Sequence, residues 1–220
     1  MGLERAGAFK TVAFSEIEPH ACKVLARHWP NTPNHGDIRQ LNDQITEPVD
    51  VICGGFPCQD ISLANSGSMV GIEGKKSSLW SEFYKQIRRH DPTFCVIENS
   101  PVLRRKGLDR ILSELSAVGH DAEWHCIPAT AVDAPHSRDR VWIISYPAGL
   151  GDRLPEGQIL TRRHFVEYVH PWPTEPGVCR VANGIPDQTH RHKCLGNTVV
   201  PSIPEIIGHA ITEAARHTNH

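Results

Sequence analysis

The residue of this sequence best placed for chemistry is a cysteine at the end of a predicted strand. Cys58 lies in the stretch GGFPCQDIS (54–62), which follows an apolar run at 49–53. The paired glycines allow a tight backbone turn, and Pro57 restricts the backbone just before the cysteine. A cysteine exposed at such a turn can act as a nucleophile in its thiolate form. We therefore expect Cys58 to be reactive, whereas most cysteines are small buried side chains.

A carboxylate follows the next predicted strand. Glu98-Asn99-Ser100 comes after the apolar run at 93–97, and one strand–helix–strand crossover separates it from Cys58. Adjacent parallel strands end at the same edge of a sheet, so we expect Glu98 beside the cysteine. A carboxyl group next to a thiol can take part in acid–base catalysis. The alternative is a solvated residue that caps the strand.

Two arginines precede the last predicted strand, in the stretch APHSRDR (134–140). Residues two apart in an extended segment share a face, so Arg138 and Arg140 are expected to point the same way. Such a pair can bind a phosphate or a carbonyl oxygen, and an ordinary charged strand start is the alternative. Further along, Asn197 and Thr198 of GNTVVP (196–201) could cap the last helix or contact a ligand.

The elements that must position these residues alternate between strand and helix. Strands are expected at 11–15, 49–53, 93–97 and 141–145, and helices at about 18–28, from 79 onward, at 108–118 and at 202–215. This alternation predicts βαβ units, and hence an α/β fold with a mostly parallel sheet. Ligands of such sheets bind at the carboxyl ends of the strands. The segment 147–186 lacks this periodicity and is rich in proline and glycine, which is typical of an irregular appended region.

The composition favours a soluble intracellular protein. Hydrophobic residues make up 39% of the 220 residues, enough for a core. No apolar run approaches the roughly 20 residues that span a bilayer, and the N-terminus lacks the apolar stretch of a signal peptide. The seven cysteines form no CxxC pair, so reduced thiols are expected.

The net charge of −2 does not by itself indicate a nucleic-acid-binding protein. Basic residues nevertheless gather in four short clusters, for each of which a solvated surface is the simplest interpretation. Together they are compatible with phosphate contacts made by one face of the protein. The clusters are Arg88-Arg89-His90, Arg104-Arg105-Lys106, Arg162-Arg163-His164 and His190-Arg191-His192-Lys193.

Taken together, these motifs resemble those of the DNA cytosine-C5 methyltransferases. GGFPCQDIS resembles the Pro-Cys nucleophile motif of that family, and ENS (98–100) resembles its Glu-Asn-Val motif. SRDR (137–140) resembles the Gln-x-Arg-x-Arg motif, with His136 where Gln is usual, and GNTVVP resembles the closing Gly-Asn-x-Val-x-Pro motif. The order and spacing match from about 2 to 213. The resemblance implies a Rossmann-like, S-adenosylmethionine-dependent methyltransferase fold.

The resemblance also implies a mechanism and a partner. The partner is double-stranded DNA with one cytosine flipped out of the helix. Cys58 adds to C6 of that cytosine, Glu98 hydrogen-bonds or protonates N3, and C5 takes the methyl group from S-adenosylmethionine. Arg140 would hold the cytosine O2, while Arg138 would support the pocket. No metal is expected.

The cofactor positions implied by the resemblance lie in several segments. Glu16, with Ile17 beside it, matches the acid that binds the ribose hydroxyls, although Glu18 competes for that role. Asp37-Ile38 matches the pair that contacts adenine. The remaining cofactor contacts are expected from Phe56, Pro57, Leu79, Asn197 and Val199.

The sequence departs from the family pattern in two places. The family opens with a strand and a glycine-rich loop, whereas MGLERAG (1–7) resembles the helix after that loop, so the first strand is expected to be missing. The target-recognition region is also short. We expect a catalytic domain at 1–146, a short recognition region at 147–186 and a segment at 187–220 that returns to the catalytic domain. Candidate base-reading residues are Arg162, Arg163, His164 and Tyr168.

Three functions remain open on the sequence alone. The first is an active methyltransferase in the cytoplasm of a bacterium or phage-infected cell, paired with a restriction endonuclease or serving phage self-protection. The second is a truncated, non-catalytic remnant that still binds DNA. The third is a zinc-binding interaction module that uses His190, His192 and Cys194, although their spacing lacks a second ligand pair of the usual kind.

Overall fold

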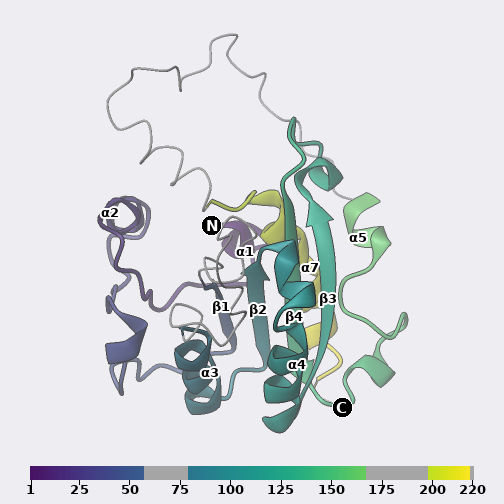
Figure 1. Ribbon diagram of the computed structural model, residues 1–220, viewed down its shortest axis with the longest axis horizontal. Coiled ribbons are helices and arrows are strands. Elements are labelled where there is room, and N and C mark those ends of the chain that lie inside the picture. Colours follow the sequence, from purple (N-terminus) through teal and green to yellow (C-terminus); the bar gives the residue numbers. More distant parts are fainter. Residues whose placement is uncertain (57–78, 167–197, 219–220) are drawn as a thin grey trace.

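Among the residues that the structure describes, a four-stranded sheet forms the centre, as Figure 1 shows. The computed structural model describes residues 1–56, 79–166 and 198–218. The strands lie side by side in the order β1-β2-β4-β3. Their bounds are Val51–Gly55 for β1, Phe94–Asn99 for β2, His120–Pro128 for β3 and Asp139–Pro147 for β4.

The sheet is mixed among the described strands. β1 and β2 are parallel, as the alternation predicts, and Gly55 lies opposite Glu98 at their carboxyl ends. β4 is antiparallel to both β2 and β3. The segment 129–138 joins β3 to β4 directly, and a connection without a crossover element returns the chain antiparallel. The α/β prediction is confirmed, but parallel pairing is limited to β1 and β2.

Helices cover both faces of this sheet. On one face α7 (Ser202–Ala215) packs through Ile206 and Ile207 against a cluster that includes Ile144 of β4. On the other, α3 (Leu79–His90) and α4 (Leu108–Ala117) pack against a cluster that includes Ile143. Neighbouring strand residues point to opposite faces, so each isoleucine of β4 belongs to a different layer. The helices predicted near 79, 108 and 202 are confirmed.

The strand predicted at 11–15 is wrong. Within the part of the chain that the structure describes, Phe14 forms only an isolated parallel bridge with Asn34, and no ladder develops around it. The helix predicted after it is confirmed as α2 (Pro19–His28), but no residue of α2 is buried. Because the segment 11–15 and α2 lie beside the sheet rather than within it, their apolar residues are only partly covered.

The two ends of the chain meet through small residues. The short helix α1 (Gly2–Arg5) lies against α7. A Cβ on Gly2 would come within 2.5 Å of the Pro201 carbonyl oxygen, and one on Gly208 would come within 2.8 Å of the Ala6 Cβ. Both positions therefore need glycine for close helix approach. This packing holds the described end of the GNTVVP motif beside the N-terminus.

Candidate active site

Glu98 and Arg140 form the centre of the candidate site. Glu98 lies near the end of β2, and Arg140 lies near the start of the antiparallel β4 beside it. Arg140 Nε is 2.7 Å from Glu98 Oε1, and each side chain is largely covered. A second guanidine nitrogen of Arg140, Nη1, donates to the Asp139 carbonyl at 2.7 Å. The ENS and SRDR motifs thus meet in the structure, a contact that the sequence analysis did not specify.

Burial and charge act in opposite directions on Glu98. Burial raises the pKa of Glu98, while the nearby Arg140 and Arg138 pull it down, and the net direction is upward. The pKa of Arg138 is lowered by burial and by the like charge of Arg140. A raised carboxyl pKa keeps the proton on the acid to higher pH, as a general acid requires. Both arginines thus favour the ionised form of Glu98 and oppose the effect of burial.

Gly55 and Phe56 are the last described residues before Cys58 in the sequence. A Cβ on Gly55 would lie 2.9 Å from the Glu98 carbonyl oxygen and 3.0 Å from its Oε2, so the lack of a side chain lets β1 end against this carboxylate. Phe56 is buried and packs against Trp80 of α3 with ring centroids 5.7 Å apart. Pro57 and Cys58 lie outside the described residues. The described chain therefore ends, on this side, within two residues of Cys58 and in contact with Glu98.

Asn99 is a positioning residue that the motif contained but to which sequence reasoning gave no role. Its side chain is buried, and Nδ2 donates to the Phe56 carbonyl at 3.2 Å. Its Oδ1 accepts from the Ser100 backbone N–H at 2.8 Å. Asn99 therefore ties the end of β2 to the backbone that leads into Pro57-Cys58. A polar residue just after the apolar run at 93–97 was the feature of the sequence that could have indicated this role.

Replacing Asn99 by alanine is expected to lower the free energy of unfolding by about 1–3 kcal/mol, because the buried Phe56 carbonyl loses its donor. Urea denaturation of the two proteins measures this change. Asn42→Ala removes an exposed amide and serves as the control, with an unchanged midpoint expected. Equal midpoints for Asn99→Ala and the wild type would show that this hydrogen bond contributes nothing.

The proposed ribose-binding segment is held in place by Asn34. Asn34 Oδ1 accepts from the Glu16 N–H and its Nδ2 donates to the Glu16 carbonyl, both at 3.0 Å. The Ser15 hydroxyl donates to the Gly36 carbonyl at 2.8 Å. These contacts bring the segment of Glu16 and Ile17 next to that of Asp37 and Ile38. The two segments assigned to the cofactor by sequence are therefore neighbours.

The structure separates the roles of the competing acids Glu16 and Glu18. Glu18 is the N-cap of α2, and its Oε2 accepts from the Ala21 N–H at 2.8 Å. The Glu16 carboxylate lies outside the helix, where its Oε1 accepts from the backbone N–H groups of Ile17 and Glu18, each at 2.8 Å. Ile17 is 62% exposed. An acid beside an exposed apolar side chain fits a ribose-bearing ligand, and this favours Glu16.

The adenine-side residues share one hydrophobic cluster. Ile38 and Leu79 pack against the cluster that contains Phe56. The neighbouring Asp37 carboxylate caps the 3-10 helix Ile38–Gln40 and binds Arg39 Nη2 at 2.6 Å, and this contact lowers the pKa of Asp37. An apolar wall with a carboxylate at its rim fits an adenosyl group. Val199 is 37% exposed just before α7, while Pro57 and Asn197 lie outside the described residues.

The candidate recognition residues are only partly described. Arg163 Nη2 binds Glu213 Oε1 of α7 at 2.9 Å, and His164 Nε2 lies 3.5 Å from the other oxygen of Glu213. These two side chains of α5 (Arg162–Val166) therefore hold α5 against α7. Tyr168 and the residues of the zinc alternative, His190, His192 and Cys194, lie outside the described residues. Within the described ranges, no three His, Cys, Asp or Glu side chains group as a metal site.

No helix in the described part of the chain is both long and apolar enough to cross a membrane.

Solved structures with a similar fold are methyltransferases. The Entamoeba histolytica methyltransferase EhMeth has a TM-score of 0.66 at 12% identity, with 97% of this chain and 95% of that chain covered. A Spodoptera frugiperda DNMT2 mutant has a TM-score of 0.54 at 19% identity, covering 68% of this chain and 47% of that one. At these identities the likeness establishes the fold, the Rossmann-like methyltransferase fold that the motifs predict.

The family follows from the sequence match. The family model described as C-5 cytosine-specific DNA methylase matches residues 1–167, and the chain belongs to this family. Type II methyltransferase M.Eco47II of Escherichia coli is 31% identical over 161 residues, covering 70% of this chain and 38% of the relative. Type II methyltransferase M.Sau3AI of Staphylococcus aureus is 32% identical over 168 residues, covering 68% and 41%. The chain thus spans well under half the length of these relatives.

Proposed function

We propose that this chain transfers a methyl group to C5 of cytosine in double-stranded DNA. The observation that carries the proposal is the ion pair between Glu98 and Arg140, set against the end of β1 that leads to Cys58. Membership of the cytosine-specific DNA methylase family supports the substrate. The cytosine is flipped out of the duplex to reach this edge of the sheet.

The proposed reaction divides the work among the side chains at this edge. The Cys58 thiolate forms a bond to C6, while Glu98 in its acid form gives its proton to N3 and so neutralises the ring. Arg140 donates hydrogen bonds to O2, and Arg138 supports the charge of the pocket. After C5 has gained the methyl group, water or hydroxide takes the C5 proton, the bond between sulfur and C6 breaks to release the thiolate, and N3 returns its proton to the Glu98 carboxylate. These steps regenerate the Cys58 thiolate and leave 5-methylcytosine in the DNA.

The proposed cofactor is S-adenosylmethionine, which when bound supplies the methyl group as an electrophile. Glu16 would hold the ribose hydroxyls, and Ile17, Asp37 and Ile38 would contact the adenosyl group. Phe56 and Leu79 would form the apolar wall, with Pro57, Asn197 and Val199 completing it. The shared cluster of Ile38, Leu79 and Phe56 supports this assignment.

The test is incubation of the purified chain with methyl-labelled S-adenosylmethionine and unmethylated mixed-sequence DNA. Label recovered as 5-methylcytosine after digestion to nucleosides is the expected result. DNA in which every cytosine is already methylated at C5 is the matched control and should take up no label. Label on adenine, or equal label on both DNAs, would contradict the proposal.

The alternative of a non-catalytic remnant that still binds DNA predicts a different result. Such a chain would retain DNA in a mobility-shift assay but transfer no label, because binding and transfer depend on different groups. Transfer by the chain therefore removes this alternative. If the chain is active, we propose that it methylates DNA in the cytoplasm of a bacterium or phage-infected cell. It would serve there as the partner of a restriction endonuclease or in phage self-protection.

A further inference from the structure

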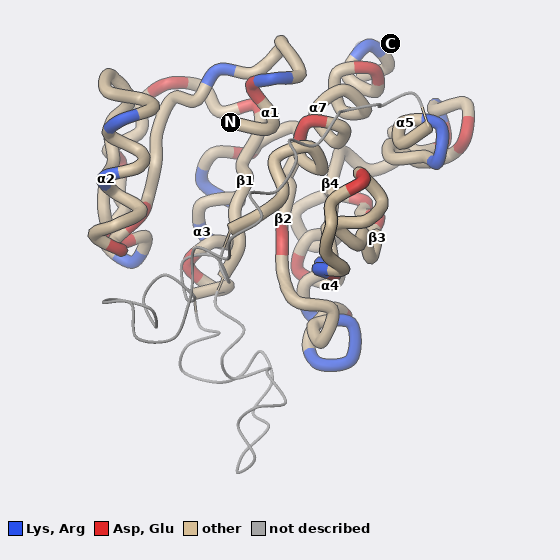
Figure 2. Tube along the Cα trace, turned by 90° about the horizontal axis from the view of Figure 1, so that it is seen from above, with Lys and Arg blue, Asp and Glu red and all other residues tan. Residues whose placement is uncertain are grey.

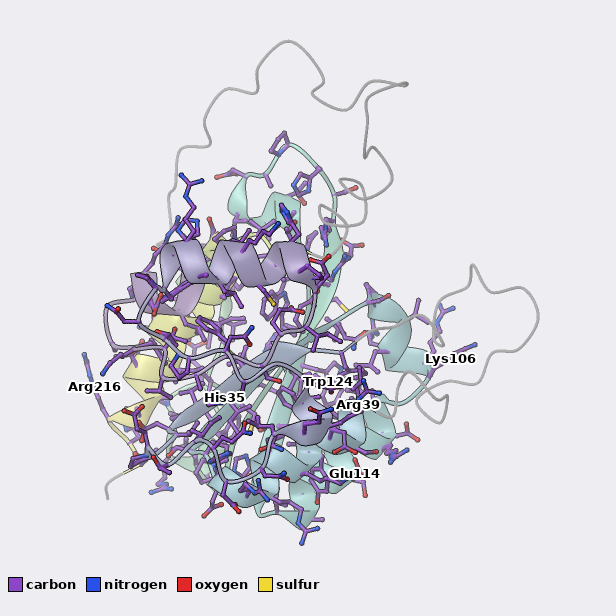
Figure 3. All side chains as sticks on the ribbon, turned by 90° about the vertical axis from the view of Figure 1, so that its left-hand side faces the viewer. His35, Arg39, Lys106, Glu114, Trp124 and Arg216 are labelled. Atoms are coloured by element: carbon purple, nitrogen blue, oxygen red, sulfur yellow. The ribbon has the colours of Figure 1, made fainter. Side chains whose placement is uncertain are left out.

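One basic cluster, Arg104-Arg105-Lys106, follows directly on the strand that carries Glu98 of the candidate active site. The 3-10 helix Pro101–Arg105 begins immediately after Glu98-Asn99-Ser100, at the carboxyl end of β2. Arg104 and Arg105 are exposed in its last turn, and Lys106 follows. Figure 2 shows this turn as a basic segment beyond the end of β2, and Figure 3 places Lys106 at the outer rim of the molecule.

The turn that carries these arginines is firmly held. Leu103 is fully buried in the cluster under α4. The Ser100 hydroxyl accepts from the Val102 N–H, and the Lys106 N–H donates to the Leu103 carbonyl at 3.0 Å. Gly107 closes the turn with a φ of 133°, which only glycine adopts readily. The two guanidinium groups are therefore presented by a preorganised backbone.

The electrostatic surroundings of the turn favour an anion. The sequence contains no Asp or Glu between Ser100 and Leu108. Arg104 Nη1 donates to an uncharged atom, Cys126 Sγ of β3, at 3.6 Å. An exposed pair of guanidinium groups suits the oxygens of phosphate, which it can bind bidentately.

The other described clusters are placed or engaged differently. Arg88 and Arg89 lie in the last turn of α3. The chain continues from there to the amino end of β2, whereas Glu98 lies near the carboxyl end of that strand. Arg89 also lies 3.6 Å from the Asp43 carboxylate. Arg163 of α5 is bound to Glu213, as described above.

We propose that Arg104 and Arg105 bind backbone phosphates of the DNA duplex. The inference rests on the proposed function and adds to it the surface that holds the duplex. Phosphate contacts of this kind position the duplex without reading its sequence. They also release counterions, so each contact adds to the salt dependence of binding.

The test compares two double variants with the same loss of charge, R104Q/R105Q and R88Q/R89Q. The binding of a duplex oligonucleotide is measured by fluorescence anisotropy at several salt concentrations. The logarithm of the association constant decreases linearly with the logarithm of the salt concentration. The magnitude of this slope should be smaller by about 2 in R104Q/R105Q, roughly 1 for each arginine, and should be unchanged in R88Q/R89Q. The affinity loss should be equal for duplexes of different sequence. Thermal melting of each variant checks that it is folded.

The remaining outcomes separate this inference from the proposed function. A wild-type slope in folded R104Q/R105Q, with methyl transfer intact, overturns the phosphate contact and leaves the proposed function in place. An equal fall in slope for both double variants also overturns it, because it shows a general effect of charge. Absence of DNA binding and of methyl transfer in the wild type overturns both.

Discussion

The Cys58→Ala variant is expected to lose methyl transfer by on the order of 10³-fold or more, because it lacks the thiol that is proposed to form the bond to C6 and so make C5 reactive. The loss should appear in kcat, with little change in the dissociation constant for DNA, since the thiol contributes to the reaction rather than to docking. Initial rates with methyl-labelled S-adenosylmethionine at saturating DNA measure this effect. Cys126→Ala, which removes an exposed cysteine of β3, is the control and should keep the wild-type rate.

A second readout isolates the covalent step. In DNA with 5-fluorocytosine at the target, C5 carries fluorine in place of the proton that must leave, so the enzyme and DNA should stay joined after methyl transfer. The wild type and Cys126→Ala should give a denaturation-resistant complex, and Cys58→Ala should give none. A covalent complex with Cys58→Ala would assign the nucleophile to another residue.

The places of Glu98 and Arg140 at the ends of strands could be predicted from sequence, because apolar runs mark both strands. The apolar run at 93–97 identifies a buried strand, and its end fixes where Glu98 lies. The run at 141–145 does the same for Arg140. The 2.7 Å contact between the two side chains could not be predicted, because it depends on the antiparallel pairing of β2 with β4, whereas the sequence predicted a mostly parallel sheet.

β3 could not be predicted because its side chains carry little hydrophobic pattern. The strand HDAEWHCIP (120–128) has polar or exposed residues at most positions and lies at an edge of the described sheet. It is held by its long antiparallel pairing with β4, a contact between distant residues that no local window contains. Missing this hairpin also made the sheet seem more parallel than its described part is.

The segment 11–15 shows the opposite error. TVAFS has the apolar, β-branched composition of a strand, yet a strand also needs a partner along its length. Here Phe14 bridges only to Asn34, and its ring packs edge-on against Trp29 with centroids 5.3 Å apart. The apolar side chain of Phe14 is thus used for packing against Trp29, although the composition of its segment is typical of a strand. The role of Asn99 was missed for a related reason, because its partner, the Phe56 carbonyl, belongs to another strand's end.

The second large effect is expected at Glu98. Glu98→Gln keeps the shape of the side chain and can still donate a hydrogen bond, but it cannot give a proton to N3. Loss of general acid catalysis is expected to lower kcat by about 10²–10⁴-fold. The matched control is Glu114→Gln in α4, whose carboxylate pairs with Arg110 rather than with Arg140. A kcat for Glu98→Gln within a few-fold of the wild type would exclude proton donation by this residue.

The pH dependence of the rate gives the same residue a sharper test. Burial raises the pKa of Glu98, and its acid form is the one proposed to act, so kcat should fall as the pH rises through that pKa. Arg138 opposes the rise by favouring the ionised form, so Arg138→Gln should raise the pKa further and move this falling limb to higher pH. Glu98→Gln should lack the limb altogether. A limb that stays in place in both variants would belong to another group, and Glu98 would then act only through its hydrogen bond.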